Sequence, residues 1–290
     1  MKKWAYALIV MAATLWGIIS IFVKGLAEYG FTTLQIVAIR VVLSAIILTF
    51  YFAIKDRQLL KIEPAHGKYF IGTGILSIAF FNWCYFTAMR ETSVAVAAIL
   101  LYTAPAFVLL LARLLFGERL TTGKIAALVV TFFGCALVVG ILPSPQGAMP
   151  LYGLVSGLGA GFGYALYSVF SKFALRHYSA LTVTVYTFVF AAAVMLPASG
   201  LWEVRTLLFH WPVVAYSIGF SLFSTILAYL CYTVALAYIE TGRAAIVATL
   251  EPIVATTVGI MFFGEQLNNW QLLGIILVIA AVVSVQRNRE

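Results

Sequence analysis

Residues 248–267 read ATLEPIVATTVGIMFFGEQL, an apolar run in which Glu251 and Pro252 stand side by side. No lysine or arginine lies within seven residues of Glu251 in either direction. A carboxylate without a partner is costly away from water, and proline removes a backbone donor from any helix that passes through it. A proline followed by Phe-Gly-Glu also occurs in residues 101–120, LYTAPAFVLLLARLLFGERL. The proline therefore occurs in both stretches, whereas the carboxylate beside it occurs only in the second.

The amino-acid composition indicates the environment of the folded chain. Of 290 residues, 63% are hydrophobic and 10% are charged, whereas soluble domains have about 25% charged residues. The net charge is +8, but the basic residues lie between long apolar runs and not on one amphipathic face, so no nucleic-acid partner is expected. The composition predicts an all-α integral membrane protein with the lipid bilayer as a partner.

A helix needs about 20 apolar residues to cross the hydrocarbon core. We predict ten transmembrane helices, and we interpret the first run as a span and not as a signal peptide because it is long and lacks a small-x-small cleavage pattern. The predicted spans are 4–23, 32–54, 68–89, 93–115, 123–142, 151–173, 181–199, 212–236, 241–262 and 269–286.

The basic residues predict the orientation. With ten spans both termini share one side, and fourteen of the 18 Lys and Arg residues fall on that side. Three fall on the opposite side and one, Arg40, lies within a span. Because short cytoplasmic loops carry the excess of positive charge, we expect an N-in/C-in, multi-pass protein of the cytoplasmic (inner) membrane.

The sequence contains an internal repeat. A shift of 147 residues places Cys84-Tyr85 on Cys231-Tyr232, Pro105 on Pro252, and LFGERL on FFGEQL. We expect one repeat in residues 1–142, a connecting loop in 143–150 and a second repeat in 151–290. Each repeat has five spans, an odd number, so the second is inverted relative to the first. Such an inverted 5+5 repeat can open to either side of the membrane, which predicts a secondary transporter with a site near the midplane.

Several stretches carry a family resemblance. LWG at 15–17, the arginine of AIRVVLSAIIL (38–48), residues 100–121 and residues 248–283 resemble the two EamA domains of the drug/metabolite transporter superfamily, over essentially the whole chain. The resemblance implies ten helices, a central cavity bounded mainly by helices 1, 3, 4, 6, 8 and 9, and export of metabolites or amino acids.

Glu251 and the two prolines are the first candidates for the site. Glu251 lies about ten residues into its span, ~15 Å deep and near the midplane. The carbonyls freed by Pro105 and Pro252 need protein or water beside them, so both broken helices are expected to line the substrate path. Glu251 either binds a cationic group or cycles a proton; alternatively it is a buried glutamate, neutral or ion-paired, that fixes helix packing.

Arg40 is the other charge within a span, ~12 Å deep. It can form a packing ion pair with Glu251 or bind a substrate carboxylate, and we favour the structural role because the family cavity does not include helix 2. Neither charge has a charged counterpart in the other repeat: Arg40 aligns with Phe188, and Glu251 aligns with Ala104.

Aromatic and polar side chains complete the predicted cavity, because tyrosine and tryptophan combine a flat apolar face with a polar tip. The candidates are Trp16, Asn82, Trp83, Tyr85, Tyr102, Tyr164 and Tyr232; for any one of them the alternative is ordinary core packing. Glycines at 153, 157 and 161, and at 159 and 163, predict close contacts along one helix. Each Phe-Gly-Glu triplet is expected to end one helix and place its glutamate, Glu118 or Glu265, near the start of the next.

Other classes of function fit the sequence less well. His66, His177 and His210 lie near span ends, and no Ser/His dyad, carboxylate pair, metal cluster or P-loop can be assembled, so we expect no enzyme, no cofactor and no metal. We predict export of a small-molecule substrate, most simply hydrophobic or aromatic amino acids, by a monomer, with protons as the candidate coupling ion. The alternatives are efflux of toxic organic cations or drugs, and a channel or membrane signalling protein.

Overall fold

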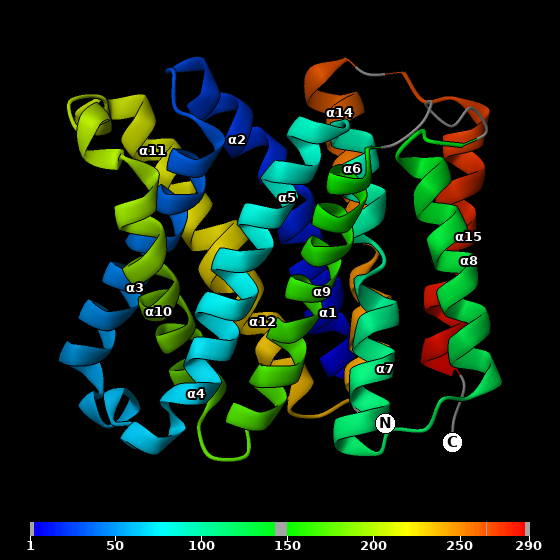
Figure 1. The fold of residues 1–290 in the computed structure, drawn as a ribbon, viewed down its shortest axis with the longest axis horizontal. Coiled ribbons are helices and arrows are strands. Elements are labelled where there is room, and N and C mark those ends of the chain that lie inside the picture. The colour runs from blue at the N-terminus through cyan, green and yellow to red at the C-terminus, as the bar shows by residue number, and fades with distance from the viewer. Residues whose placement is uncertain (1–2, 143–149, 265, 288–290) are drawn as a thin grey trace.

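The structure is a computed structural model, and it describes residues 3–142, 150–264 and 266–287. The predicted connecting loop, apart from residue 150, and Glu265 lie outside the described residues. Every regular element within those ranges is helical, and the helices stand side by side as one bundle (Figure 1).

The first part of the chain forms α1 (Lys3–Gly17), α2 (Ile19–Glu28), α3 (Thr33–Lys55), η1 (Arg57–Leu60), η2 (Pro64–His66), α4 (Gly67–Phe70), η3 (Ile71–Ala79), α5 (Phe80–Glu91), α6 (Val94–Leu101), α7 (Ala104–Phe116) and α8 (Thr122–Val138). The second part forms α9 (Leu151–Ala174), α10 (Ala180–Ser199), η4 (Leu201–Val204), η5 (Leu207–Phe209), α11 (Trp211–Gly219), η6 (Phe220–Leu227), α12 (Ala228–Leu236), α13 (Thr241–Ala248), α14 (Glu251–Phe263) and α15 (Asn269–Arg287).

The helices are long and apolar enough to cross a bilayer. Among the described residues, nine helical segments of 18 or more residues meet this requirement, and the 17-residue helix α8 is a shorter apolar helix. Large apolar side chains such as Phe50 and Ile54 lie on the outside of the bundle, 68% and 72% exposed. This apolar surface suits lipid, and the chain is an integral membrane protein.

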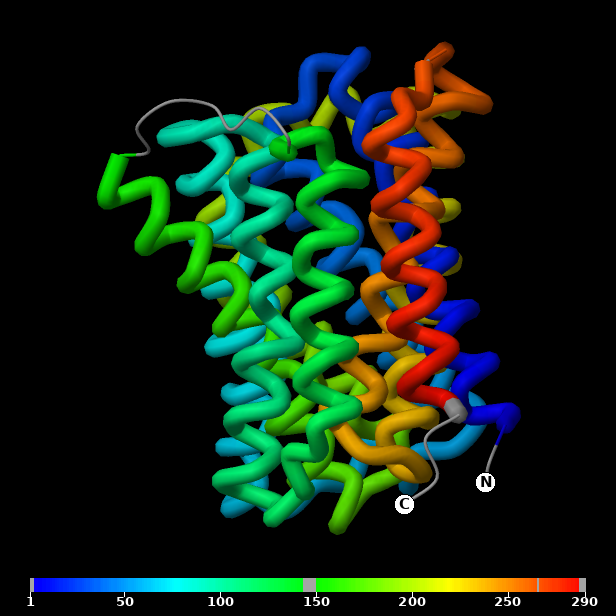
Figure 2. Tube along the Cα trace, turned by 90° about the vertical axis from the view of Figure 1, so that its right-hand side faces the viewer, coloured from blue at the N-terminus to red at the C-terminus, as the bar shows by residue number. Residues whose placement is uncertain are grey.

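Both ends of the chain lie at one end of the bundle (Figures 1 and 2). We call this end the terminal face. The peptide connections after α3, α7, α9 and α12 lie at the same end, whereas α2, α5 and α14 finish at the other (Figure 1).

Paired structural features recur 147 residues apart. The helix that begins at Val94 is interrupted at Tyr102–Thr103, and the helix that begins at Thr241 is interrupted at Thr249–Leu250. Pro105 and Pro252 are the second residues of α7 and α14, where a missing N–H costs least. Both helices end at a glycine in the left-handed conformation, with φ of 68° at Gly117 and Gly264.

The glycines of α9 pack it against two neighbours. A Cβ added at Gly161 would lie 2.5 Å from Thr103 Oγ1 and 3.0 Å from the carbonyl oxygen of Leu100, at the end of α6. On the other stripe, a Cβ at Gly163 would lie 3.1 Å from the Cα of Phe81 in α5. The predicted close contacts are therefore confirmed, and they fix α9 against both halves of the α5–α6 hairpin.

Candidate functional site

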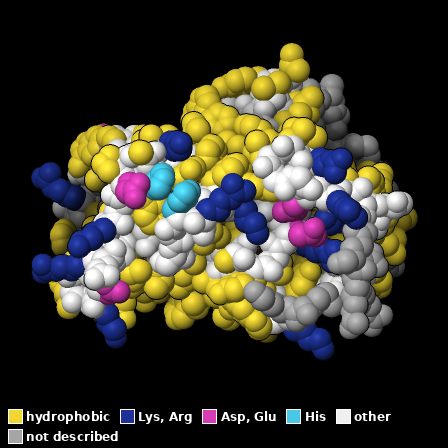
Figure 3. Space-filling view, turned by 90° about the horizontal axis from the view of Figure 1, so that it is seen from below, with side chains coloured by type: hydrophobic (Ala, Val, Ile, Leu, Met, Phe, Trp, Pro, Cys, Tyr) yellow, Lys and Arg dark blue, Asp and Glu magenta, His cyan; other side chains and the backbone are white. Residues whose placement is uncertain are grey.

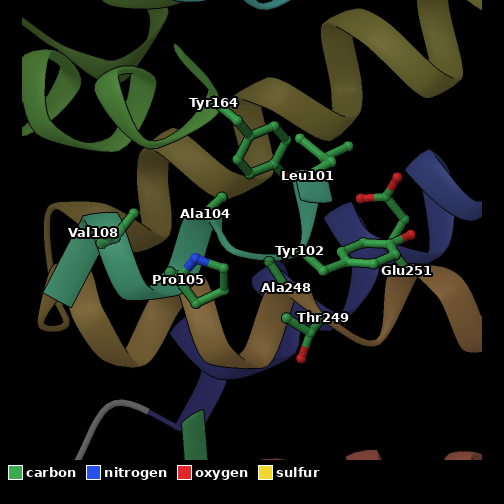
Figure 4. A pocket seen from close by; sticks show the side chains of 10 residues that line it. Leu101, Tyr102, Ala104, Pro105, Val108, Tyr164, Ala248, Thr249 and Glu251 are labelled. Carbon is green, nitrogen blue, oxygen red and sulfur yellow. The ribbon is translucent and has the colours of Figure 1, made fainter. Parts of the chain in front are cut away.

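The two helix breaks meet at a small cavity near the middle of the bundle. It is lined by the ends of α6 and α13, the starts of α7 and α14, and one residue of α9: Leu101, Tyr102, Ala104, Pro105, Val108, Tyr164, Ala245, Ala248, Thr249 and Glu251 (Figure 4). The centre of a water molecule can move within about 20 Å³ of this cavity. That is room for about one water. We call this state closed because the space is too small for a metabolite, which can bind only when the helices separate.

Threonine hydroxyls occupy the backbone acceptors at both breaks. Thr103 Oγ1 donates to the carbonyl oxygen of Leu100 at 2.6 Å, and Thr249 Oγ1 donates to that of Ile246 at 2.5 Å. These bonds satisfy carbonyls near the point where the regular ladder is interrupted, and so they make the breaks tolerable at this depth in a membrane.

Glu251 begins α14 and lies beside the Tyr102 ring (Figure 4). Its carboxylate forms no hydrogen bond or ion pair within the part of the chain that the structure describes, although it interacts electrostatically with Arg40. Tyr102 and Tyr164 line the cavity with it, and Pro105 does so from the start of α7. Pro252 is buried.

An aromatic cluster extends the site toward α12. The ring of Trp16 lies 6.2 Å from that of Tyr164, 5.3 Å from Tyr229 and 5.4 Å from Tyr232, measured between centroids. The Tyr232 hydroxyl is 2.8 Å from Ser168 Oγ, which fixes its position. Tyr229 was not predicted; the repeat offers a signal for it, because Tyr229 aligns with the candidate Asn82 at the 147-residue shift.

The remaining candidates of the first repeat lie in three different settings. Tyr85 stacks on Phe81 at 5.7 Å and interacts electrostatically with Glu251, but it is not among the residues that line the cavity. Asn82 is buried, and its amide donates to the carbonyl oxygen of Ile78 at 2.7 Å, one turn earlier at the end of η3. Trp83 lies on the outside of the bundle, 62% exposed. The structure does not bring Trp83 together with the others.

Arg40 lies close to Tyr229 and is not among the residues that line the cavity. Its side chain is 6% exposed, interacts electrostatically with Tyr229 and lies 5.4 Å from the centre of the Phe220 ring. It interacts with the charge of Glu251 but does not contact that carboxylate directly. Of the two predicted roles, a packing ion pair with Glu251 would therefore lack direct contact, and the role of a substrate ligand stays a prediction.

At the terminal face, Glu118 joins two helices that are far apart in sequence. Its Oε1 accepts from the backbone N–H of Thr241 at 2.7 Å, and its Oε2 accepts from that of Gly242 at 3.1 Å. As predicted, the triplet ends α7, and Glu118 lies four residues before the start of α8. Thr121 caps α8, however, and the Glu118 carboxylate caps α13, a partner that the sequence did not indicate. A carboxylate suits the positive end of that helix, and we call this contact the Glu118 latch.

Charged side chains surround the latch. Lys124 Nζ lies 3.0 Å from the Glu240 carboxylate, and Arg243 Nε lies 2.6 Å from it. Partial burial disfavours the Glu240 carboxylate, but the hydrogen bonds and charges of Lys124 and Arg243 outweigh it and lower the pKa of Glu240. Lys172 Nζ donates to the carbonyl oxygens of Leu236 and Ile239 at 2.6 and 2.9 Å.

A second contact on this face joins η2 to the segment after α9. His66 Nδ1 is 2.8 Å from the Tyr178 hydroxyl, and the rings of His66 and His177 are 4.3 Å apart. Figure 3 shows this histidine pair and the Lys and Arg side chains spread over the same face. Sequence patterns gave no signal for the pair, because 111 residues separate its members.

A bundle of apolar helices, broken in its middle around a closed polar-aromatic cavity, defines the chain as a membrane protein of the transporter class. The model of the EamA-like transporter family matches residues 3–140 and 151–286. The chain belongs to this family, within the drug/metabolite transporter superfamily, as its sequence predicts.

The similar proteins are named as transporters. An uncharacterized transporter of Archaeoglobus fulgidus is 29% identical over 289 residues, covering 98% of this chain and 97% of the relative. The threonine/homoserine exporter RhtA of Escherichia coli is 27% identical over 252 residues, covering 85% and 79%. A solved crystal structure, 15% identical, superposes with a TM-score of 0.79 over 98% of this chain and 96% of that one, which shows the same fold.

Proposed function

We propose that the protein is a secondary transporter that exports amino acids by alternating access. One observation carries the proposal: a closed cavity lies where two interrupted helices meet, with Glu251 on one helix and Tyr102 and Pro105 on the other. An interrupted helix presents polar backbone groups at the depth where a substrate must be held. The cavity is too small for a metabolite in this state, so binding requires the helices to move apart.

The proposed topology has ten spans in an inverted 5+5 arrangement, with α8 as the shortest span. The paired breaks, prolines and left-handed glycines 147 residues apart support it. We assign the terminal face to the cytoplasm, because most lysines and arginines fall on that side. The Glu118 latch then closes the cytoplasmic end of the path, and a single chain contains both halves of a complete carrier.

The wall chemistry favours amino acids. Tyr102, Tyr164 and Trp16 offer flat apolar faces with polar tips, and Glu251 offers a carboxylate to an ammonium group. The threonine/homoserine exporter among the relatives supports the same class of substrate. Hydrophobic and aromatic amino acids fit the aromatic wall. The sequence contains no P-loop, so we propose protons as the coupling ion, with Glu251 as the group that carries them.

Reconstitution tests this function. Purified protein in liposomes loaded with unlabelled amino acid is expected to accumulate the labelled amino acid by counterflow, with saturation. A pH gradient is expected to drive transport by the wild type, and Glu251→Gln is expected to lose that response. If counterflow is absent, or if flux does not saturate, the carrier proposal fails. If Glu251→Gln keeps both the rate and the pH dependence, proton coupling through Glu251 fails.

Efflux of organic cations is the second candidate function, because a carboxylate beside several aromatic rings also suits a cation. Competition in the same vesicles separates the two. Amino acids are expected to inhibit counterflow, and quaternary ammonium dyes are expected not to do so. The reverse order would identify the protein as a cation exporter.

A further inference from the structure

The buried guanidinium of Arg40 lacks part of its hydrogen bonding. It lies within a membrane-spanning helix, and its Nε–H has no acceptor in the described parts of the chain. Its nearest aromatic neighbours are Tyr229, with which it interacts electrostatically, and Phe220, whose ring centre lies 5.4 Å from the guanidinium carbon. A buried structural ion pair is stable only when its groups are in direct contact and fully hydrogen-bonded. Arg40 meets neither condition, so packing alone does not explain it.

A second donor without an acceptor lies beside the same tyrosine. The indole Nε1–H of Trp16 is buried and has no hydrogen-bond partner among the described residues. The Trp16 ring packs edge-on against Tyr229 at 5.3 Å. Two buried N–H groups without an acceptor in the described ranges, one of them charged, thus belong to side chains that lie next to Tyr229. Unpaired buried donors cost free energy, and an anionic oxygen is the acceptor that both would bind most strongly.

Glu251 supplies the opposite charge. Its carboxylate interacts electrostatically with both Arg40 and Tyr229, yet it makes no hydrogen bond with the residues that the structure describes. The two opposite charges are therefore close enough to interact, but they form no direct ion pair among these residues. A ligand that bears both charges on one small backbone would satisfy the acid and the base together.

From this arrangement we infer that Arg40 and Glu251 form a two-point receptor for the zwitterionic backbone of an α-amino acid. Arg40 and the Trp16 indole bind the carboxylate, and Glu251 binds the ammonium group. The aromatic wall is then left to contact the side chain, which allows several amino acids to share one site. The inference rests on the proposed function and adds to it a requirement: both charges of the substrate are recognised, by residues of different repeats.

The receptor predicts a crossed pattern of selectivity. Full-length protein in liposomes is tested with phenylalanine, with phenethylamine, which lacks the carboxylate, and with 3-phenylpropionate, which lacks the ammonium group. The wild type is expected to bind phenylalanine about 10- to 100-fold more tightly than either analogue, the range for one charged hydrogen-bonded contact. Arg40→Gln removes this advantage over phenethylamine only, and Glu251→Gln removes it over 3-phenylpropionate only.

Trp16→Phe keeps an aromatic ring at this position and deletes the Nε1–H. It is therefore the second test variant if the Arg40→Gln protein does not fold. It is expected to weaken phenylalanine and 3-phenylpropionate but not phenethylamine. Trp270→Phe, at a half-exposed position of α15, is the matched control and is expected to change nothing. Equal losses for all three compounds in Arg40→Gln and Trp16→Phe would overturn the receptor and leave amino-acid transport standing. Wild-type counterflow with organic cations but with no amino acid would overturn the proposed function itself.

Discussion

The Glu118 latch makes a quantitative prediction about the closed state. Glu118 comes from the connection after α7, and the two N–H groups that it accepts belong to the first residues of α13. Both helices line the central cavity. Replacing Glu118 with alanine therefore removes a direct link between them and is expected to favour opening at the terminal face.

The geometry sets the size of the effect. A hydrogen bond to a charged group contributes about 1.5–3 kcal/mol, and two such bonds are lost in Glu118→Ala. Water can reach the two N–H groups once the face opens and offsets part of this loss, so we take about 3 kcal/mol as the net change. That shifts the equilibrium between closed and open forms by roughly 100-fold. Glu118→Gln keeps one carbonyl oxygen as an acceptor and is expected to shift it by about 10-fold.

Thiol labelling measures this equilibrium. Val108 lines the cavity and is 0% exposed in the closed structure, so Val108→Cys reports opening in a background where Cys84, Cys135 and Cys231 are alanine. A membrane-impermeant maleimide, applied from the side of the terminal face, is expected to react about 100-fold faster with the Glu118→Ala variant. Glu63→Ala removes an exposed glutamate of the same face and is the matched control. Equal labelling rates in all three backgrounds would refute the latch.

Three further predictions concern stability. Glu240→Gln is expected to lower the Tm of the purified protein by about 2 °C near neutral pH. The ion pairs lower the pKa of Glu240, so their contribution to stability is complete above about pH 4.3 and is lost as the pH falls through the lowered pKa. Melting curves at a series of pH values are expected to show that the Tm difference between the variant and the wild type vanishes in acid. Gly161→Val is expected to destabilise the protein by about 2 kcal/mol because its Cβ meets the backbone of α6, whereas Gly67→Ala, which has open space, is expected to be neutral in the same denaturation assay. Tyr178→Phe removes the hydroxyl that contacts His66 and accepts a hydrogen bond from the N–H of Glu63. The rate of amide hydrogen exchange in residues 57–66 is expected to rise by about 5-fold, while the rate in α15 is expected not to change.

The sequence was most informative where one residue type decides the local structure. Apolar length predicted where the helices lie, because lipid requires it, and the prolines at 105 and 252 predicted where two of them are interrupted. Contacts between distant helices were not predictable in this way. Glu118 binds residues 123 and 124 positions away, and nothing in the Phe-Gly-Glu triplet specifies which helix start it caps. Tyr229 was missed although the repeat aligns it with Asn82, because its proximity to Arg40 and Trp16 depends on how other helices pack.

The two unpaired charges occupy special positions relative to the repeat. Phe188, which aligns with Arg40, packs against Tyr229 at 5.3 Å between ring centroids, and Ala104, which aligns with Glu251, lines the same cavity as that glutamate. Corresponding positions of the two repeats thus converge on one centre, as expected if an axis relating the repeats passes through it. A scaffold that is nearly symmetric about this centre can open toward either side with similar energy. Selectivity for a substrate with two different charged ends requires an asymmetric site. The chain provides this asymmetry because each repeat carries one charge, and the aligned position in the other repeat carries an apolar residue.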